Sequence, residues 1–295
     1  MTYTRLLVLG DSHAPERAAA HLASSGVLKV EAAPGHIPAS LDNTALWVNT
    51  GKATSIRGAG IDLPLLSPGP TWLSTVPGHF LGRKLVCTTL GRLRQDWQEH
   101  GAIRLAEQQY GVLGYERFPC SPEIFVDHLT RHHRRGTALP FANDVQVIAS
   151  APVEYTDRYR VFIANAEVSA STRLAAVQDG RRRTPAYEGA AEDQTAAAEH
   201  FARKVIDATI WHQPPGFRID VGITRDGSWQ LISAGPSWDS VFLEANPTGV
   251  VNSVLAGQAP GHDHWKWTPD EFFQRIMFRS WPAPAGPAAA VGQLG

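Results

Sequence analysis

Asp220 is the residue whose position most strongly indicates chemistry. It lies in Phe217–Ile223, where apolar and polar residues alternate as in a half-buried β-strand. Residues 225–228 form a turn signal, and Trp229–Ile232 returns as a second strand, with Ser233 directly after it. A carboxylate placed in such a strand needs a charged or hydrogen-bonding partner. We therefore expect a functional role for Asp220 at one end of a β-hairpin.

Basic residues gather in two short runs, 131–135 and 181–183. Solvated loops are the simpler interpretation of these runs, and a rim that binds phosphates is the alternative. The net charge of the 295-residue chain is only -1, which gives no reason to expect nucleic acid or a membrane surface as a partner. No apolar run approaches the roughly 18 residues of a membrane-spanning helix, so we expect a cytoplasmic protein.

The elements that must position Asp220 fall into several parts. A strand at Leu6–Leu9, a helix at Pro15–Ser25 and a strand at Ala45–Asn49 predict a small α/β unit with an open sheet. Residues 63–78 are rich in Pro and Gly and predict a linker or long loop. We therefore place an N-terminal subdomain at residues 1–78.

The remaining elements predict two further subdomains, at 79–150 and 151–281, and a disordered tail at 282–295. The central subdomain has predicted helices at 90–99 and 121–134 and strands at 102–106, 115–118 and 145–149. The C-terminal subdomain has a predicted strand pair over 159–172 that turns at Asn165-Ala166, then helices at 193–208, 247–255 and 269–279 around the Asp220 hairpin.

Matching segments over about residues 77–256 resemble the ATP-grasp enzymes. The resemblance rests on Phe80–Arg83 with Thr88–Gly91, on Ala151–Glu154, on Tyr159–Phe162, and on the hairpin with Asp220 followed by Pro236 and Trp238. It implies an α/β (α+β) ATP-grasp fold behind a small open-sheet N-terminal subdomain, in a small, divergent branch of carboxylate–amine ligases.

The resemblance also implies a reaction and a set of site residues. The reaction would be ATP-dependent ligation of an amine (or thiol) to a small-molecule or peptide carboxylate through an acyl-phosphate. Such phosphoryl transfer depends on positioning and on charge neutralisation. Arg104, Arg160 and Arg173 would then neutralise phosphates, Glu154 and Ser171 would help to hold the nucleotide, and Asp220 would bind Mg²⁺.

The hairpin departs from the family pattern at the metal ligands. The family's Glu and Asn positions are Ser233 and Gly235 in this chain, which removes a negative charge where Mg²⁺ needs hard oxygen ligands. Glu244-Ala245-Asn246 spells the missing pair eleven residues downstream. Glu244 and Asn246 are therefore candidate relocated metal ligands, with Asp239 as another. The alternative is that Glu244 only precedes a helix and is favoured there by the helix dipole.

Two other functions stay open. The altered metal positions suit a noncatalytic ATP-grasp-like protein that binds a nucleotide or a partner. Leu6–Ser12 also resembles the opening block of Gly-Asp-Ser-type esterases, with Ser12 as nucleophile, although His262-Asp263-His264 lacks the spacing of their Asp-x-x-His. A homodimer is compatible with the sequence, which identifies neither the carboxylate nor the nucleophile.

Overall fold

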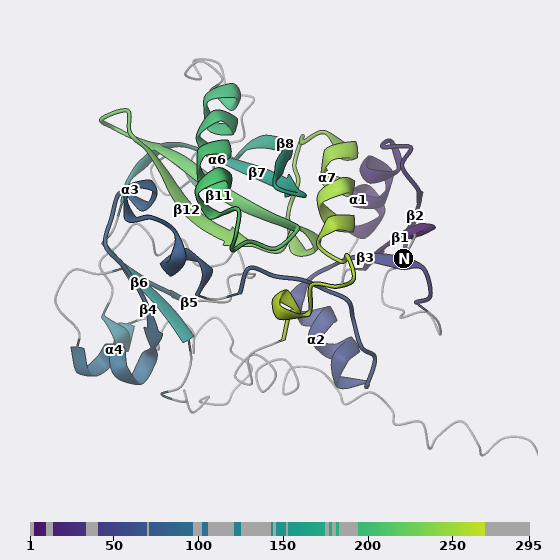
Figure 1. Cartoon of the computed structure of the whole chain (residues 1–295), viewed down its shortest axis with the longest axis horizontal. Coiled ribbons are helices and arrows are strands. Elements are labelled where there is room, and N and C mark those ends of the chain that lie inside the picture. Colours follow the sequence, from purple (N-terminus) through teal and green to yellow (C-terminus); the bar gives the residue numbers. More distant parts are fainter. Residues whose placement is uncertain are drawn as a thin grey trace, which may run out of the picture.

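The N-terminal subdomain is a three-stranded parallel sheet with helices packed against it (Figure 1). The computed structural model describes residues 3–9, 14–33, 41–69, 71–96, 102–105, 121–124, 143, 146–151, 153–174, 177–178, 181–182 and 194–268. The strands β1 (Arg5–Leu9), β2 (Lys29–Ala32) and β3 (Thr44–Val48) lie in the order β2-β1-β3, with helices α1 (Ala14–Ala23) and α2 (Thr50–Gly58). The predicted strands and the first helix are present.

Helix α2 was not predicted, because its apolar residues form no regular stripe. Asn49 caps this helix, and its side chain accepts a hydrogen bond from the backbone N–H of Lys52 at 2.8 Å. The helix therefore begins directly after β3, at the edge of the parallel sheet. Its first residue, Thr50, is 1% exposed.

The Pro- and Gly-rich segment after α2 is a buried loop. It contains only a short 3-10 helix, η1 (Trp72–Thr75), yet Leu63, Leu65 and Trp72 are at most 1% exposed. Leu66 joins the loop to the C-terminal region: its N–H donates to Gly257 O at 2.9 Å, and its carbonyl accepts from Trp238 Nε1 at 2.7 Å. The loop is thus part of the core rather than a solvent-exposed linker.

The central part is a second, antiparallel sheet in the order β4-β6-β5. Its strands are β4 (Leu85–Thr89), β5 (Ala102–Leu105) and β6 (Gln146–Ser150), with helices α3 (Gly78–Leu81) and α4 (Leu90–Asp96). The strand β4 was not predicted. The predicted strand 115–118, most of helix 121–134, helix 269–279 and the tail lie outside the described residues.

The C-terminal part is a four-stranded antiparallel sheet in the order β12-β11-β7-β8. The strands are β7 (Tyr155–Ala164), β8 (Glu167–Leu174), β11 (Gly216–Thr224) and β12 (Trp229–Gly235). The β7–β8 turn falls at Asn165 and Ala166, whose φ angles of 51° and 64° suit a tight two-residue hairpin. Two-residue strands β9 (Val177–Gln178) and β10 (Arg181–Arg182) form a separate ladder.

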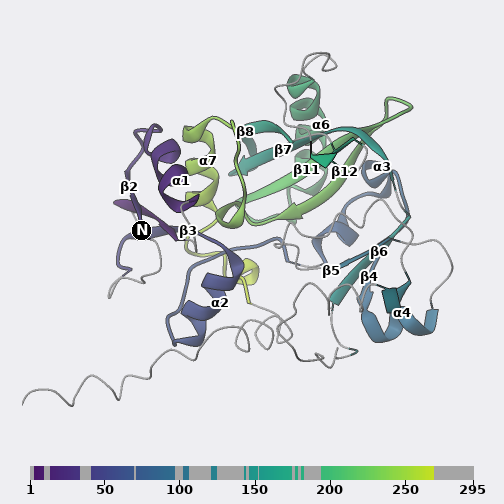
Figure 2. The same ribbon diagram turned by 180° about the vertical axis from the view of Figure 1, so that it is seen from behind.

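Two helices cover opposite faces of this sheet. Helix α6 (Thr195–Thr209) packs on Tyr159, Val161 and Ile219, whereas α7 (Pro247–Ala256) packs on Phe162 and Ala170 and continues into the core of the N-terminal subdomain. Figure 1 and the view from behind in Figure 2 both show α7 between the sheet and α1. Because strand residues alternate between faces, each polar residue of the sheet belongs to one of these two environments.

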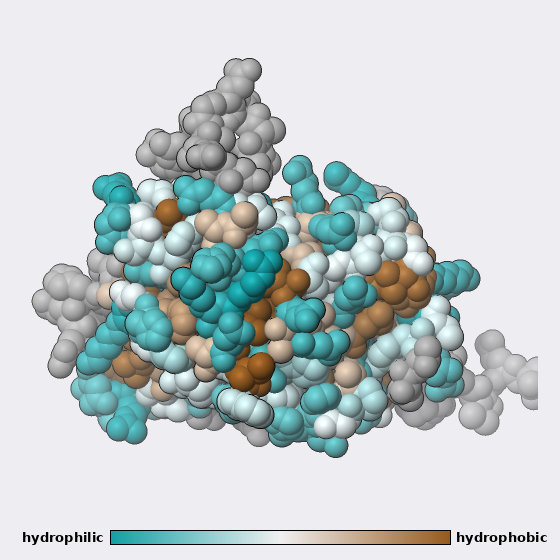
Figure 3. All heavy atoms as spheres, turned by 45° about the horizontal axis from the view of Figure 1, so that its top comes forward, coloured by the Kyte–Doolittle hydropathy of each residue, from teal (hydrophilic) through white to brown (hydrophobic). Residues whose placement is uncertain are grey.

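The outer surface in Figure 3 is mostly hydrophilic, and its hydrophobic areas are separated by polar side chains. In the described part of the chain, none of the helices is long and apolar enough to cross a membrane.

Candidate functional site

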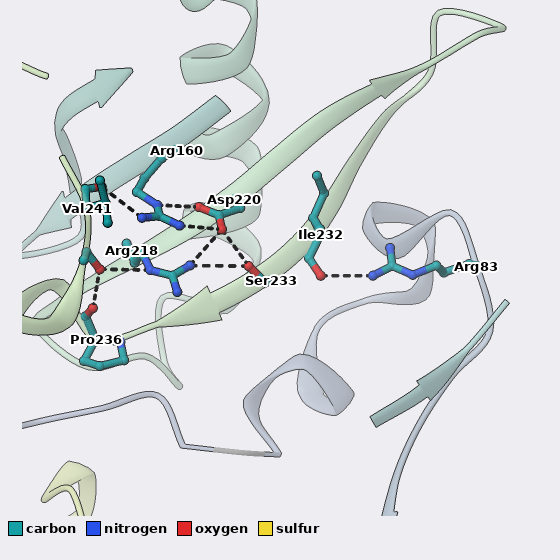
Figure 4. Close-up of polar contacts among 9 residues, drawn as sticks. Arg83, Arg160, Arg218, Asp220, Ile232, Ser233, Pro236 and Val241 are labelled. Carbon is teal, nitrogen blue, oxygen red and sulfur yellow. Dashed lines mark hydrogen bonds and ion pairs between the residues drawn. The ribbon is translucent and has the colours of Figure 1, made fainter. Parts of the chain in front are cut away.

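Asp220 is the centre of a buried cluster of charged and hydroxyl side chains (Figure 4). Its Oδ1 accepts a hydrogen bond from Arg160 Nε at 2.8 Å, and its Oδ2 accepts from Arg160 Nη2 at 3.0 Å. Oδ2 also accepts from Arg218 Nη1 and from Ser233 Oγ, both at 2.9 Å. These four hydrogen bonds match the roughly four lone-pair sites of a carboxylate. We refer to Arg160, Arg218, Asp220 and Ser233 as the Asp220 cluster.

The strand register explains why these side chains meet. Asp220 on β11 lies opposite Arg160 on β7 and opposite Ser233 on β12. Arg218 lies two residues before Asp220 on the same strand, so both side chains project from the same face. The cluster therefore forms on the face that α7 and the N-terminal subdomain cover, and Arg160 Nη1 also donates to Val241 O at 2.9 Å.

Gly235 makes room for Arg218. It lies directly opposite Arg218 in the β11–β12 ladder. A Cβ atom added to Gly235 would be 3.0 Å from Arg218 Nη2 and 3.2 Å from Arg218 Cζ, closer than ordinary contact. The guanidinium of Arg218 thus lies across the glycine, and a longer side chain there would collide with it.

The charges around Asp220 keep it ionised. Burial alone would raise the pKa of Asp220, but the positive charges of Arg160 and Arg218, with hydrogen bonds from Arg160 and Ser233, hold the pKa well below its usual range. The single negative charge faces two guanidinium groups, so the cluster carries an excess of positive charge. Arg218 is 6% exposed and Asp220 is 8% exposed.

A second carboxylate, Asp239, lies next to the cluster in a different environment. Its Oδ2 accepts hydrogen bonds from the backbone N–H of Thr50 at 3.1 Å and from Thr50 Oγ1. Burial raises the pKa of Asp239 to about 7, against the lowering effect of Thr50 and of the charges on Arg218 and Arg160. Asp239 therefore joins the C-terminal sheet region to the start of α2.

Ser240 links the two carboxylate environments. Its Oγ accepts from Arg218 Nε at 2.9 Å and donates to Pro236 O at 2.6 Å, and its carbonyl accepts from Trp47 Nε1 at 3.2 Å. Neither Arg218 nor Ser240 was among the predicted site residues. The signal for Arg218 was available, because a residue two positions from Asp220 on a strand shares its face.

Two predicted site residues, Arg173 and Ser171, lie on the opposite face of the sheet. Arg173 forms an ion pair with Asp157, with Nε donating to Oδ1 at 3.0 Å, and Ser171 Oγ donates to Glu199 of α6 at 2.7 Å. The sheet separates this group from the Asp220 cluster. The structure thus brings together Arg160 and Asp220 but not Arg173 or Ser171.

The other predicted nucleotide-binding residues lie further along the chain. Glu154 precedes β7 and pairs with Arg225 of the β11–β12 turn at 2.9 Å, with both side chains largely exposed. Arg104 lies in β5 opposite Ile148 of β6, and its side chain is outside the described part of the structure. The roles of Arg104, Glu154, Arg173 and Ser171 stay predictions.

The downstream Glu-x-Asn pair is located at the start of α7. Asn246 caps the helix, and its Oδ1 accepts from the backbone N–H of Gly249 at 3.2 Å. Glu244 is exposed, two residues before this cap. Within the described residues, no three His, Cys, Asp or Glu side chains form a group that could hold a metal ion, and this includes His262, Asp263 and His264. Ser12 lies outside the described residues.

The residues around Asp220 do not fit a divalent cation. Mg²⁺ requires oxygen ligands, usually including carboxylates. The Asp220 oxygens already accept bonds from two guanidinium groups, the Ser233 hydroxyl donates its proton to Asp220, and Gly235 has no side chain. Each like unit charge about 4 Å away opposes a further unit charge by about 4 kcal/mol at an effective dielectric constant of about 20. The predicted metal ligands Asp220, Glu244 and Asn246 stay untested predictions.

The fold and the family agree on the class of this protein. The paired sheets and the Asp220 hairpin have the arrangement of an ATP-grasp fold, as the sequence predicted. The chain matches a family model described as an ATP-grasp domain, the third family of its clade, over residues 94–255, more than half of its length. The chain belongs to this ATP-grasp family.

Solved structures with a related fold are distant in sequence. D-cycloserine synthetase DcsG is 14% identical, with a TM-score of 0.46, and the match covers 85% of this chain and 98% of that one. The N5-carboxyaminoimidazole ribonucleotide synthetase purK in its ADP complex is 11% identical, with a TM-score of 0.47 and coverage of 86% and 77%. D-alanine–D-alanine ligase from Bacillus anthracis, complexed with ATP, is 9% identical, with a TM-score of 0.42 and coverage of 86% and 96%. No curated protein matches the chain.

Proposed function

We propose that this chain is a noncatalytic ATP-grasp protein that binds a nucleotide without a carboxylate-held Mg²⁺. The observation that carries the proposal is the engagement of Asp220 by Arg160, Arg218 and Ser233. In an ATP-grasp ligase, metal ions neutralise the charge that develops on the transferred phosphoryl group. A carboxylate that is already paired with two arginines cannot recruit such an ion without breaking buried ion pairs.

Binding of a nucleotide makes smaller demands than turnover. Phosphates are recognised by guanidinium groups through bidentate hydrogen bonds. Arg160 and Arg218 together exceed the charge of Asp220 by one unit, so the cluster favours an anionic ligand over a cationic one. The family membership supports a nucleotide as that anion.

The test is nucleotide binding with and without Mg²⁺. ATP and ADP affinities are measured by calorimetry in EDTA and in excess Mg²⁺, and we expect them to agree within about twofold. We also expect no ADP to form from ATP over hours. An Mg²⁺-dependent gain of tenfold or more that disappears in Asp220→Asn would contradict the proposal. Glu154→Gln is a matched control, because it removes an exposed carboxylate.

The second candidate is the ATP-dependent carboxylate–amine (or thiol) ligase of the sequence prediction, acting on a small-molecule or peptide carboxylate. The observation that favours it is that Arg160 and Asp220, two residues of the family resemblance, meet in one cluster. Release of ADP that requires both Mg²⁺ and an added carboxylate would establish this candidate and overturn the first. A cytoplasmic location and a homodimer stay predictions for either candidate.

A further inference from the structure

We infer that Arg218 is a built-in cation that takes the place of the divalent metal ion, and that Ser233 and Gly235 are the residues that admit it. The inference deepens the proposed function, because a ligand phosphate is what this cation would neutralise. It assigns a specificity role to Arg218 and a reason to both departures from the family pattern.

The positions of the departures support this assignment. The two altered residues are the direct cross-strand partners of Asp220 and Arg218: Asp220 lies opposite Ser233, and Arg218 lies opposite Gly235. Unrelated losses at a decayed site would not need to match the two residues that now form an ion pair. At Gly235 even a Cβ atom would be 3.0 Å from the guanidinium. The glycine is therefore a steric requirement for the present position of Arg218.

The chemistry of Ser233 points the same way. Its hydroxyl donates to Asp220 Oδ2 at 2.9 Å and accepts from Arg218 Nη1 at 3.4 Å. A carboxylate at this position would add a second negative charge, which suits a divalent cation. A neutral hydroxyl that both donates and accepts suits one guanidinium beside one carboxylate. The charge of the position thus matches the monovalent cation that is present.

Arg218 is also held in place from its other side. Its Nε donates to Ser240 Oγ, and that hydroxyl in turn donates to Pro236 O, so the guanidinium plane is oriented at both ends. A guanidinium fixed in this way is preorganised, as a bound metal would be. An exposed arginine such as Arg225, whose side chain is 80% exposed, has no comparable support.

The deciding experiment measures binding of Mn²⁺ alone, by electron paramagnetic resonance, and needs no nucleotide. We expect no saturable binding at Asp220 in the wild-type chain or in Ser233→Glu/Gly235→Asn, because Arg218 still occupies the position. Adding Arg218→Met to that pair should create one Mn²⁺ site, at least tenfold tighter than in the double variant. The same pair with Arg225→Met is the matched control and should gain no site.

Two outcomes of this experiment would overturn the inference. One is stoichiometric Mn²⁺ binding by the wild-type chain that Asp220→Asn abolishes. The other is equal Mn²⁺ affinity with and without Arg218 in the Ser233→Glu/Gly235→Asn background. Circular dichroism and urea unfolding first establish that each variant is folded.

A single variant keeps the inference testable if the triple variant does not fold. Arg218→Gln should weaken ATP binding at least tenfold, and added Mn²⁺ should not restore it; unchanged affinity would overturn the inference. If the wild-type chain binds no nucleotide at all, the proposed function fails on that result, whereas the Mn²⁺ assay still decides the role of Arg218. The two failures are therefore distinguishable.

Discussion

Asp220 and Asp239 are neighbouring carboxylates whose environments have opposite effects on their charge. Asp220 receives hydrogen bonds from two guanidinium groups and a hydroxyl, whereas Asp239 receives them from the backbone and hydroxyl of Thr50. The pKa of Asp220 is held below its usual range, and the pKa of Asp239 is raised to about 7. The comparison teaches that the partner, and not burial alone, decides whether a carboxylate in this region is ionised.

The two environments also differ in what they connect. The Asp220 cluster joins three strands of one sheet, so it is internal to the C-terminal part. Asp239 joins that part to α2 of the N-terminal subdomain through Thr50. Ser240 bonds to Arg218 on one side and to Trp47 on the other, so it connects the two environments physically.

Removing Asp220 should produce the largest effect. Asp220→Ala would leave Arg160 and Arg218 without the carboxylate that pairs them, and breaking a buried ion pair costs about 3 to 5 kcal/mol. We expect a loss of that size in the free energy of unfolding, measured with urea at pH 7. Asp207→Ala, at an exposed position of α6, is the control and should stay within about 0.5 kcal/mol of wild type. A loss below about 1 kcal/mol for Asp220→Ala would show that the pairs contribute little.

Asp239 should produce a pH dependence of up to about 4 kcal/mol. Because its pKa is higher in the folded chain than in the unfolded chain, its stabilising contribution is complete below pH about 4 and is lost as the pH rises through about 7. Asp239→Asn should remove this slope in urea unfolding between pH 4 and 8. An unchanged slope in the variant would show that Asp239 is ionised throughout.

Asp220 should produce the opposite pH dependence. Its pKa is lower in the folded chain, so its contribution is complete above the unfolded value near 4 and is lost as the pH falls further. Unfolding measured between pH 5 and 2.5 should therefore show a steeper loss in wild type than in Asp220→Asn. Equal slopes in the two proteins would argue against ionised Asp220 in the folded state.

The smallest effect is expected at Thr50. Thr50→Val removes the hydroxyl that donates to Asp239 and keeps the backbone N–H and the side-chain shape. We expect a loss of about 1 kcal/mol at neutral pH, as for a typical hydrogen bond. The pKa of Asp239 should rise further, because a donor to its charged form is lost. Thr54→Val, which removes a hydroxyl bonded to a backbone carbonyl within α2, is the matched control and should leave that pKa unchanged.

The sequence predicted much of the fold because local patterns were strong. Alternation over Phe217–Ile223 and the turn at Asn165-Ala166 identified both hairpins of the C-terminal sheet. Helix α2 was missed because it lacks an apolar stripe, and 63–78 was taken for a linker although its leucines are buried. Composition describes the backbone preferences of such a loop but does not show what covers it.

The sequence by itself determined that Arg218 and Asp220 share a face, because strand residues two positions apart always do. It also determined that Ser233 and Gly235 cannot supply carboxylate ligands. Only the tertiary structure decided which charges meet. Arg160 reaches Asp220 through pairing of strands about sixty residues apart, Arg173 lies behind the sheet, and Asp239 meets Thr50 of another subdomain. Pairing between distant strands sets these distances, and no local pattern encodes it.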